Sequence, residues 1–145
     1  MDRQELLKFY KLHNLTEKDV YKDKRGFVII TRSGIEQIQN QNNIKVAFEV
    51  IVCHLENVVL KAVSMRYDSN AQEFIPIIET FGSASINNCK QHFLVEIAEK
   101  RALARVIIKT MHYTNVLGED EISYQKSAAK DWGNDLDAIN KLTNG

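Results

Sequence analysis

The sequence predicts an α+β fold in which a three-stranded antiparallel meander, joined by one short extra strand, is covered by one long C-terminal helix. Three consecutive segments are predicted as strands separated by short polar turns, and the first of them shows clear strand periodicity. They are followed by the longest unbroken helical pattern in the chain, at residues 87–118. The hydrophobic fraction of 44% with a single proline indicates a packed core over most of the length. The predicted order is helix, strand, helix, three strands and long helix, a layered arrangement.

Two helices and one short strand are predicted before the meander. Residues 2–13 suit a short amphipathic helix, and the highly charged segment 18–25 is interpreted as a solvated connection. The β-branched run 27–30 predicts a strand. Ser33 and Glu36 have the spacing of a capping box, which predicts a helix that continues to about residue 40.

The three meander strands are predicted at residues 44–53, 58–67 and 74–81. In the first of them, alternate positions are apolar, so that one face is better buried than the other. The segment between the second and third strands, 68–72, has the composition of a turn. Pro76 places the third strand at an edge of the sheet, because proline has no backbone N–H to donate to a neighbouring strand.

The long helix carries a stripe of cations. Its predicted N-cap is Asn87, and Arg101, Arg105 and Lys109 follow one another at intervals of four on one side. Like charges at this spacing repel by a few tenths of a kcal/mol per pair. A stripe that the chain tolerates at this cost predicts a surface that faces an anion.

Charge is unevenly distributed in a chain whose formal net charge is zero. Residues 86–117 carry five Lys and Arg against two Asp and Glu, whereas residues 118–145 carry three against six. We therefore predict an N-terminal helical segment at 1–25, a core domain at 26–118, and an acidic tail at 119–145 that is partly disordered or loosely docked. The tail is interpreted as a solubilising end, with a DNA mimic or a docking segment anchored by Trp132 as the alternative.

The sequence predicts a soluble, cytoplasmic protein that is neither an enzyme nor a metalloprotein. Two cysteines are too few for a disulfide scaffold, and the chain shows no apolar leader and no apolar run of eighteen residues. We therefore expect no membrane partner. Cys89 and His92 form only half of a zinc pattern, and no catalytic triad or phosphate-binding loop is present. No catalytic residue, metal or cofactor is therefore predicted.

Three short motifs resemble those of the single-strand annealing proteins of the RAD fifty-two type, which have many phage-encoded relatives. Residues 30–34 (ITRSG) precede the predicted meander as an "LT-x-x-G" strand does in the phage relatives. Residues 98–105 (AEKRALAR) match an "A-x-x-R-A-x-x-R" pattern on the long helix, and 118–121 (GEDE) loosely match an acidic ending. The resemblance covers residues 27–121.

The resemblance implies single-stranded DNA binding and strand annealing in recombination, by homo-oligomeric rings or filaments that need no cofactor. The strand would lie in a basic groove lined by the long helix, with Arg101 and Arg105 as the first contacts and Lys109 next. Arginine suits this role because its guanidinium binds phosphate oxygens bidentately. Arg66 and Tyr67, near the predicted hairpin tip, could stack on and clamp a strand. The full set of predicted nucleic-acid-binding residues is Arg101, Arg105, Lys109, Lys100, Arg66 and Tyr67.

Two alternatives remain open from the sequence. One is an oligomeric protein-interaction or structural domain, in which the meander pairs strands between subunits without binding nucleic acid. The other, less favoured, is recognition of double-stranded RNA, which also uses a helix and a three-stranded sheet. The helix N-terminus offers only Lys90 for that purpose.

Overall fold

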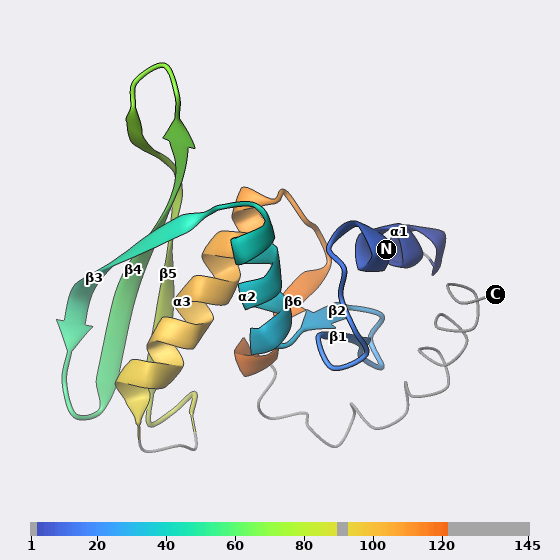
Figure 1. Cartoon of the computed structure of the whole chain (residues 1–145). Helices are drawn as coiled ribbons and strands as arrows, with labels where there is room; N and C mark the ends of the chain where they lie inside the picture. The colour runs from blue at the N-terminus through green and yellow to red at the C-terminus, as the bar shows by residue number, and fades with distance from the viewer. Residues whose placement is uncertain (1–2, 90–92, 122–145) are drawn as a thin grey trace. The chain divides into compact units, whose positions relative to one another are not determined.

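The computed structural model describes residues 3–89 and 93–121. Within these ranges, three helices and two sheets of three strands each form an α+β fold, which confirms the predicted class. The predicted element order is wrong because it lacks two strands, β1 and β6. The long helix is therefore not the last element of the described chain, since β6 follows it (Figure 1).

The chain is divided into two compact units. Residues 39–113 make up one unit, and residues 3–38 together with 114–121 make up the described part of the other. The domain boundaries predicted after residues 25 and 118 stay a prediction. Most of the predicted acidic tail, residues 122–145, lies outside the described ranges.

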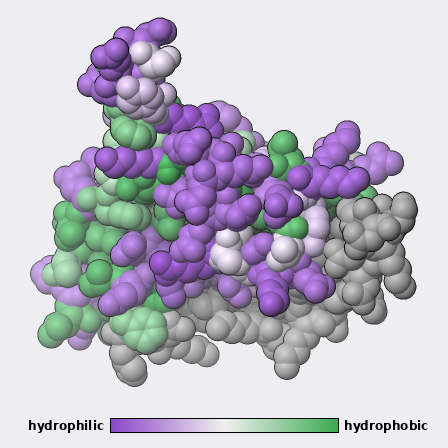
Figure 2. All heavy atoms as spheres, in the orientation of Figure 1, coloured by the Kyte–Doolittle hydropathy of each residue, from purple (hydrophilic) through white to green (hydrophobic). Residues whose placement is uncertain are grey.

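The unit of residues 39–113 contains an antiparallel meander of order β3-β4-β5. Its strands are β3 (Lys45–Cys53), β4 (Asn57–Asp68) and β5 (Glu73–Ser85). Strand β5 is an edge strand, as Pro76 predicts, and the register shifts beside that proline. Strand β3 begins at Lys45, which pairs with Met65 of β4. The residues of β4 and β5 nearer their connecting turn therefore have no β3 partner and continue as a two-stranded ribbon (Figure 1). Figure 2 shows the hydrophilic end of this ribbon and the hydrophobic residues gathered over the sheet.

Helix α3 (Leu94–Thr110) lies across β4 and β5. Alternate residues of β4 are buried on this side, from Val58 to Ser64, as the period of two requires. The closest approach is at Gly82 of β5, where an added Cβ would lie 2.5 Å from the carbonyl oxygen of Ala98 and nearer still to the amide nitrogen of Ala102. Only glycine allows the strand and the helix to pack at this separation.

The long helix is shorter than the pattern of residues 87–118 predicts. It begins at Leu94, with Phe93 at the N-cap position and no side-chain cap, so Asn87 is not its N-cap. Asn87 instead lies in a turn that follows β5. At the other end, His112 and Asn115 adopt left-handed backbone conformations with φ of 58° each. Such residues end a helix, and the apolar residues after them form β6 instead.

The second unit holds a small sheet of order β1-β2-β6. Strand β2 (Val28–Ile30) lies between β1 (Val20–Lys22), which is antiparallel to it, and β6 (Val116–Gly118), which is parallel. All three residues of β2 are fully buried, which explains why the sequence shows a continuous apolar run there instead of alternation. Helices α1 (Arg3–Leu12) and α2 (Arg32–Gln41) complete the elements that precede the meander.

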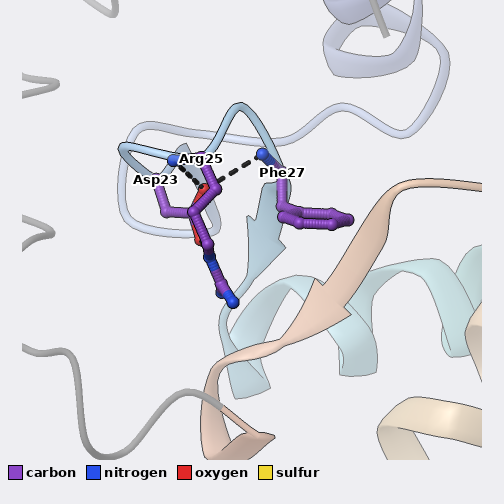
Figure 3. A network of polar contacts seen from close by, with 3 residues as sticks. All are labelled: Asp23, Arg25 and Phe27. Atoms are coloured by element: carbon purple, nitrogen blue, oxygen red, sulfur yellow. Dashed lines mark hydrogen bonds and ion pairs between the residues drawn. The ribbon is translucent and has the colours of Figure 1, made fainter.

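The charged segment 18–25 is not a solvated connection, because it contains β1 and a tight turn. Val20 and Tyr21 are buried, but a three-residue strand is too short to show periodicity among charged neighbours. Asp23 holds the turn that follows: its Oδ1 accepts hydrogen bonds from the amides of Arg25 and Phe27, at 2.9 and 3.0 Å, and its Oδ2 accepts one from Nε of Arg25 (Figure 3). The side chain of Asp23 therefore closes the turn that joins β1 to β2.

A second buried aspartate, Asp19, fixes the start of α2. Its Oδ2 accepts a hydrogen bond from the amide of Thr16 at 2.8 Å, and its Oδ1 accepts one from Oγ of Ser33. Glu36 pairs with Arg32 and not with the helix start, so the predicted capping box does not form. Thr31 takes the N-cap position instead: its carbonyl oxygen accepts the first helical hydrogen bond, from the amide of Ile35 at 2.9 Å, and its Oγ1 accepts the amide of Gly34 at 3.4 Å.

We predict that Gly82→Ala destabilises the protein. The new methyl group would force α3 away from β5, and overpacking of this kind typically costs about 1–3 kcal/mol. Urea unfolding followed by circular dichroism measures the destabilisation. The neighbouring change Ser83→Ala is the matched control, because Ser83 is exposed and should change the free energy of unfolding by less than about 0.5 kcal/mol. Equal stability of the two variants would contradict the close packing at Gly82.

Candidate nucleic-acid interface

Arg101 is a buried residue that ties α3 to the end of β5. Only 8% of the residue is exposed. Its Nη1 donates to the carbonyl oxygen of Ser83 at 2.8 Å and to Oδ1 of Asn88 at 2.9 Å, and its Nη2 donates to the carbonyl oxygen of Asn88 at 3.0 Å. A guanidinium held in this way has little surface left for a phosphate. Its burial therefore argues against the predicted contact and assigns Arg101 to the packing of the helix.

The other cations of the stripe are more accessible. Arg105 is exposed and donates from Nη1 to the carbonyl oxygen of Phe81 at 3.2 Å. Lys109, one turn further on, is exposed, and Lys100 is half-buried. The three residues of the predicted stripe thus differ in environment, and the accessible part is the C-terminal half of α3.

The projecting β4–β5 hairpin carries an exposed pair of aromatic rings. Tyr67 and Phe74 face each other across the two strands and are 56% and 43% exposed. Their ring centroids lie 5.5 Å apart with an interplanar angle of 71°, an edge-to-face contact. Nζ of Lys45, from the neighbouring strand β3, lies 5.1 Å from the centroid of the Phe74 ring. The cluster therefore combines two aromatic surfaces with a cation.

Arg66 connects this hairpin to the accessible half of α3. Its Nη2 lies 3.6 Å from Sδ of Met111, the residue that follows α3. Beside this contact, Oγ1 of Thr110 donates to Oγ of Ser64 at 2.7 Å in a buried pair. The base of the hairpin and the C-terminal end of α3 are therefore held side by side. Of the predicted residues, Arg66 lies at this junction, and Lys109 is the neighbour of Thr110 on α3. Tyr67, the next residue along β4, lies on the opposite face of the hairpin together with Phe74 and Lys45.

Sequence reasoning missed Phe74 and Lys45. Phe74 could have been found, because a turn at residues 68–72 makes it the cross-strand neighbour of Tyr67. Lys45 could not, because its place beside Phe74 depends on the register between β3 and β4.

The sheet surface opposite α3 carries a row of three charges. Nζ of Lys61 on β4 lies 2.9 Å from Oε2 of Glu49 on β3 and 3.7 Å from Oε2 of Glu79 on β5. The hydrogen bond and charge of Glu49, followed by the charge of Glu79, raise the pKa of Lys61. Two carboxylates thus surround one ammonium, so the centre of this face does not attract a phosphate backbone.

An open hollow of about 580 Å³ lies where the β3–β4 turn meets the start of α3. Its lining is mainly apolar: Cys53, His54, Leu55, Val58, Phe93, Leu94, Val95 and Glu96. Across residues 3–89 and 93–121, no three His, Cys, Asp or Glu side chains are grouped so that they could hold a metal ion. The same part of the chain contains no helix with the length and apolar character needed to cross a bilayer. The predicted cytoplasmic location stays a prediction.

Comparisons with protein-family models, with curated proteins and with solved structures found no match.

We predict that Arg101→Ala lowers stability, whereas Arg105→Ala hardly changes it. Truncation of Arg101 removes three hydrogen bonds of a charged group and empties the space of a side chain that is itself buried, which costs about 1–3 kcal/mol. Arg105 is exposed, so its truncation should change the free energy of unfolding by no more than about 0.5 kcal/mol. Denaturant unfolding of both variants is the measurement. A stable Arg101→Ala variant would show that the buried contacts of this arginine contribute little.

Proposed function

We propose that the chain binds single-stranded DNA through the β4–β5 hairpin and the C-terminal half of α3. The observation that carries this proposal is the exposed Tyr67–Phe74 pair with Lys45 beside it. The two adjacent rings offer apolar surface that a flat partner can cover. Bases of a single strand fit because each has a flat π-face.

The hairpin cluster supplies stacking without base selectivity. Stacking on an aromatic side chain contributes about 1–3 kcal/mol per base and tolerates any sequence. The Lys45 ammonium beside Phe74 adds attraction for the phosphate next to a stacked base. Neither contact reads the hydrogen-bonding edge of a base, so these edges stay available for pairing with a complementary strand.

The accessible cations of α3 supply phosphate contacts near the hairpin. Arg105 and Lys109 are exposed, and the contact of Arg66 with Met111 keeps the hairpin base against this end of the helix. The Tyr67–Phe74 pair lies on the face of the hairpin away from α3, so a strand that stacks there would pass an edge of the sheet to reach these cations. Lys100, half-buried toward the other end, is a more distant contribution. The proposal keeps Arg105 and Lys109 from the predicted set and leaves out Arg101, which is buried.

Strand annealing belongs to the same proposal. The resemblance to single-strand annealing proteins of the RAD fifty-two type implies homo-oligomers that hold a strand extended while complementary bases meet. Sequence-tolerant stacking combined with backbone contacts suits this task, because it fixes a strand and leaves its pairing edges exposed. No cofactor is required for such a process.

We predict that Tyr67→Ala/Phe74→Ala weakens binding of a labelled single-stranded oligonucleotide. If one base stacks on the pair, the dissociation constant should rise roughly fivefold to 150-fold, corresponding to about 1–3 kcal/mol. Arg105→Ala/Lys109→Ala should weaken binding too, and it should make the slope of log affinity against log salt shallower by roughly 0.7 for each phosphate that is no longer neutralised. Fluorescence anisotropy at several salt concentrations measures both effects.

The matched control is Lys11→Ala/Lys18→Ala, which removes two exposed cations from the other unit. It should leave the affinity unchanged. If the wild-type protein does not bind even at low salt, single-stranded DNA binding is wrong and the interaction-domain alternative is favoured. Tighter binding of duplex RNA than of single strands would favour the double-stranded RNA alternative.

A further inference from the structure

Strand β3 is an edge strand whose apolar side chains are largely uncovered. Helix α3 packs on β4 and β5 and hardly reaches β3. As a result Phe48, Val50 and Ile51 are 41%, 62% and 47% exposed. Exposed apolar edge strands are ready templates for pairing with another chain, and proteins that stay monomeric usually block them.

The two edges of the meander differ in how their backbone groups are used. At the β5 edge, the carbonyl oxygens of Phe81 and Ser83 accept hydrogen bonds from Arg105 and Arg101. These carbonyl groups therefore point away from β4. The arginine side chains occupy the positions that an added strand would need, so the β5 edge is closed at these residues.

The direction of the β3 backbone groups follows from the same contacts. In an antiparallel sheet the groups of successive residues point alternately to one neighbour and to the other. The backbone groups of Phe81 and Ser83 point outward. Those of Gly82, which lies between them, therefore point to β4 and bond to Leu60. The flanking residue of β4, Lys61, must then bond to β3, where it faces Glu49.

The alternation continues along β3. The amide and carbonyl groups of Glu49 and Ala47 point inward to β4, so those of Val46 and Phe48 point outward, away from the sheet. On either side of Val46 and Phe48, the backbone of β3 is less available for pairing with another strand. Gln39 already bonds to both backbone groups of Ile44, and the register shifts between Val50 and Val52. The open part of the edge is therefore short and defined.

We propose that a second copy of this chain pairs with this edge, antiparallel, through β3 of each copy, with the two-fold axis beside Ala47. In this register Val46 of one copy lies opposite Phe48 of the second copy. The two-fold axis forms this pair twice, and each pair exchanges backbone hydrogen bonds. Lys45 then lies opposite Glu49 of the second copy, twice, on the face away from α3. Opposite charges that face each other across two strands stabilise the pairing.

Charge selects this register over the alternatives. An axis beside Glu49 would overlap the full length of both strands, but it would place each Glu49 opposite its copy. An axis beside Phe48 would place Lys45 opposite the apolar Ile51 of the second copy. Only the axis beside Ala47 pairs both charges of β3 with opposite ones and buries Phe48 against an apolar neighbour.

A two-fold pair of this kind is closed, because each copy uses the open part of its β3 edge in the same contact. Continuation of the sheet from β3 of one copy to β5 of the next is blocked by Arg101 and Arg105. The ring or filament that the resemblance implies would need a contact elsewhere. The inference does not depend on nucleic-acid binding, and its tests measure only the association of the protein with itself.

The first experiment uses charge reversal and light scattering on the full chain. Wild type should have the mass of two chains, whereas Lys45→Glu and Glu49→Lys should each shift toward the mass of one, because each places like charges opposite each other. An equimolar mixture of the two variants should recover the mass of two chains, because every facing pair is then opposite in sign. A monomeric wild type, variants that stay dimeric, or a mixture that stays monomeric overturns the proposal.

The second experiment tests the position of the axis by cross-linking. In a Cys53→Ser background, which removes the exposed cysteine, Ala47→Cys should form a disulfide-linked dimer under mild oxidation. Ser83→Cys, at the closed β5 edge, is the matched control and should remain monomeric on a non-reducing gel. Cross-linking of Ser83→Cys without that of Ala47→Cys would overturn the proposed edge.

Discussion

The close packing of α3 on β5 at Gly82 is the constraint on which the rest of the meander unit depends. Backbone touches backbone there, since an added Cβ would collide with Ala98 and Ala102. The small residues bring Arg101 within reach of Ser83 and Asn88, and the buried guanidinium then fixes the turn that leads back to the helix. Packing and polar contacts thus act on the same three segments, and neither would hold without the other.

The position of α3 decides which surfaces remain available. A single helix can cover about two strands of a sheet, because a helix with its side chains is about 10–12 Å wide and strands lie about 4.8 Å apart. Here the helix covers β4 and β5, so β3 keeps its apolar side chains exposed. The same placement holds the C-terminal end of α3 against the base of the hairpin through Arg66 and Met111. Both proposed surfaces therefore follow from one packing choice.

Much of the meander could be predicted from the sequence, but the small sheet could not. Strand β4 alternates between buried and accessible residues over most of its length, which is a strong local signal. Strands β1 and β6 have three residues each, and β6 pairs with β2 although the two are far apart in the sequence. Such pairings depend on tertiary contacts and leave no periodicity. In the candidate site, Tyr67 could be predicted from its place near a turn, whereas Lys45 required the strand register.

The arginine stripe shows why a helical wheel predicts charge positions better than charge partners. Three cations at intervals of four suggest that they face one anion, because mutual repulsion must be offset by something. In this fold the backbone offsets part of it: carbonyl oxygens of an edge strand are fixed partial negative charges, and two of them meet Arg101 and Arg105. A wheel cannot reveal this, because it contains no information about the neighbouring strand. Cations that bond to the carbonyl oxygens of every second residue of an edge strand can serve to close that edge as well as to bind a phosphate. The burial of each cation separates the two roles, whereas its spacing in the sequence does not.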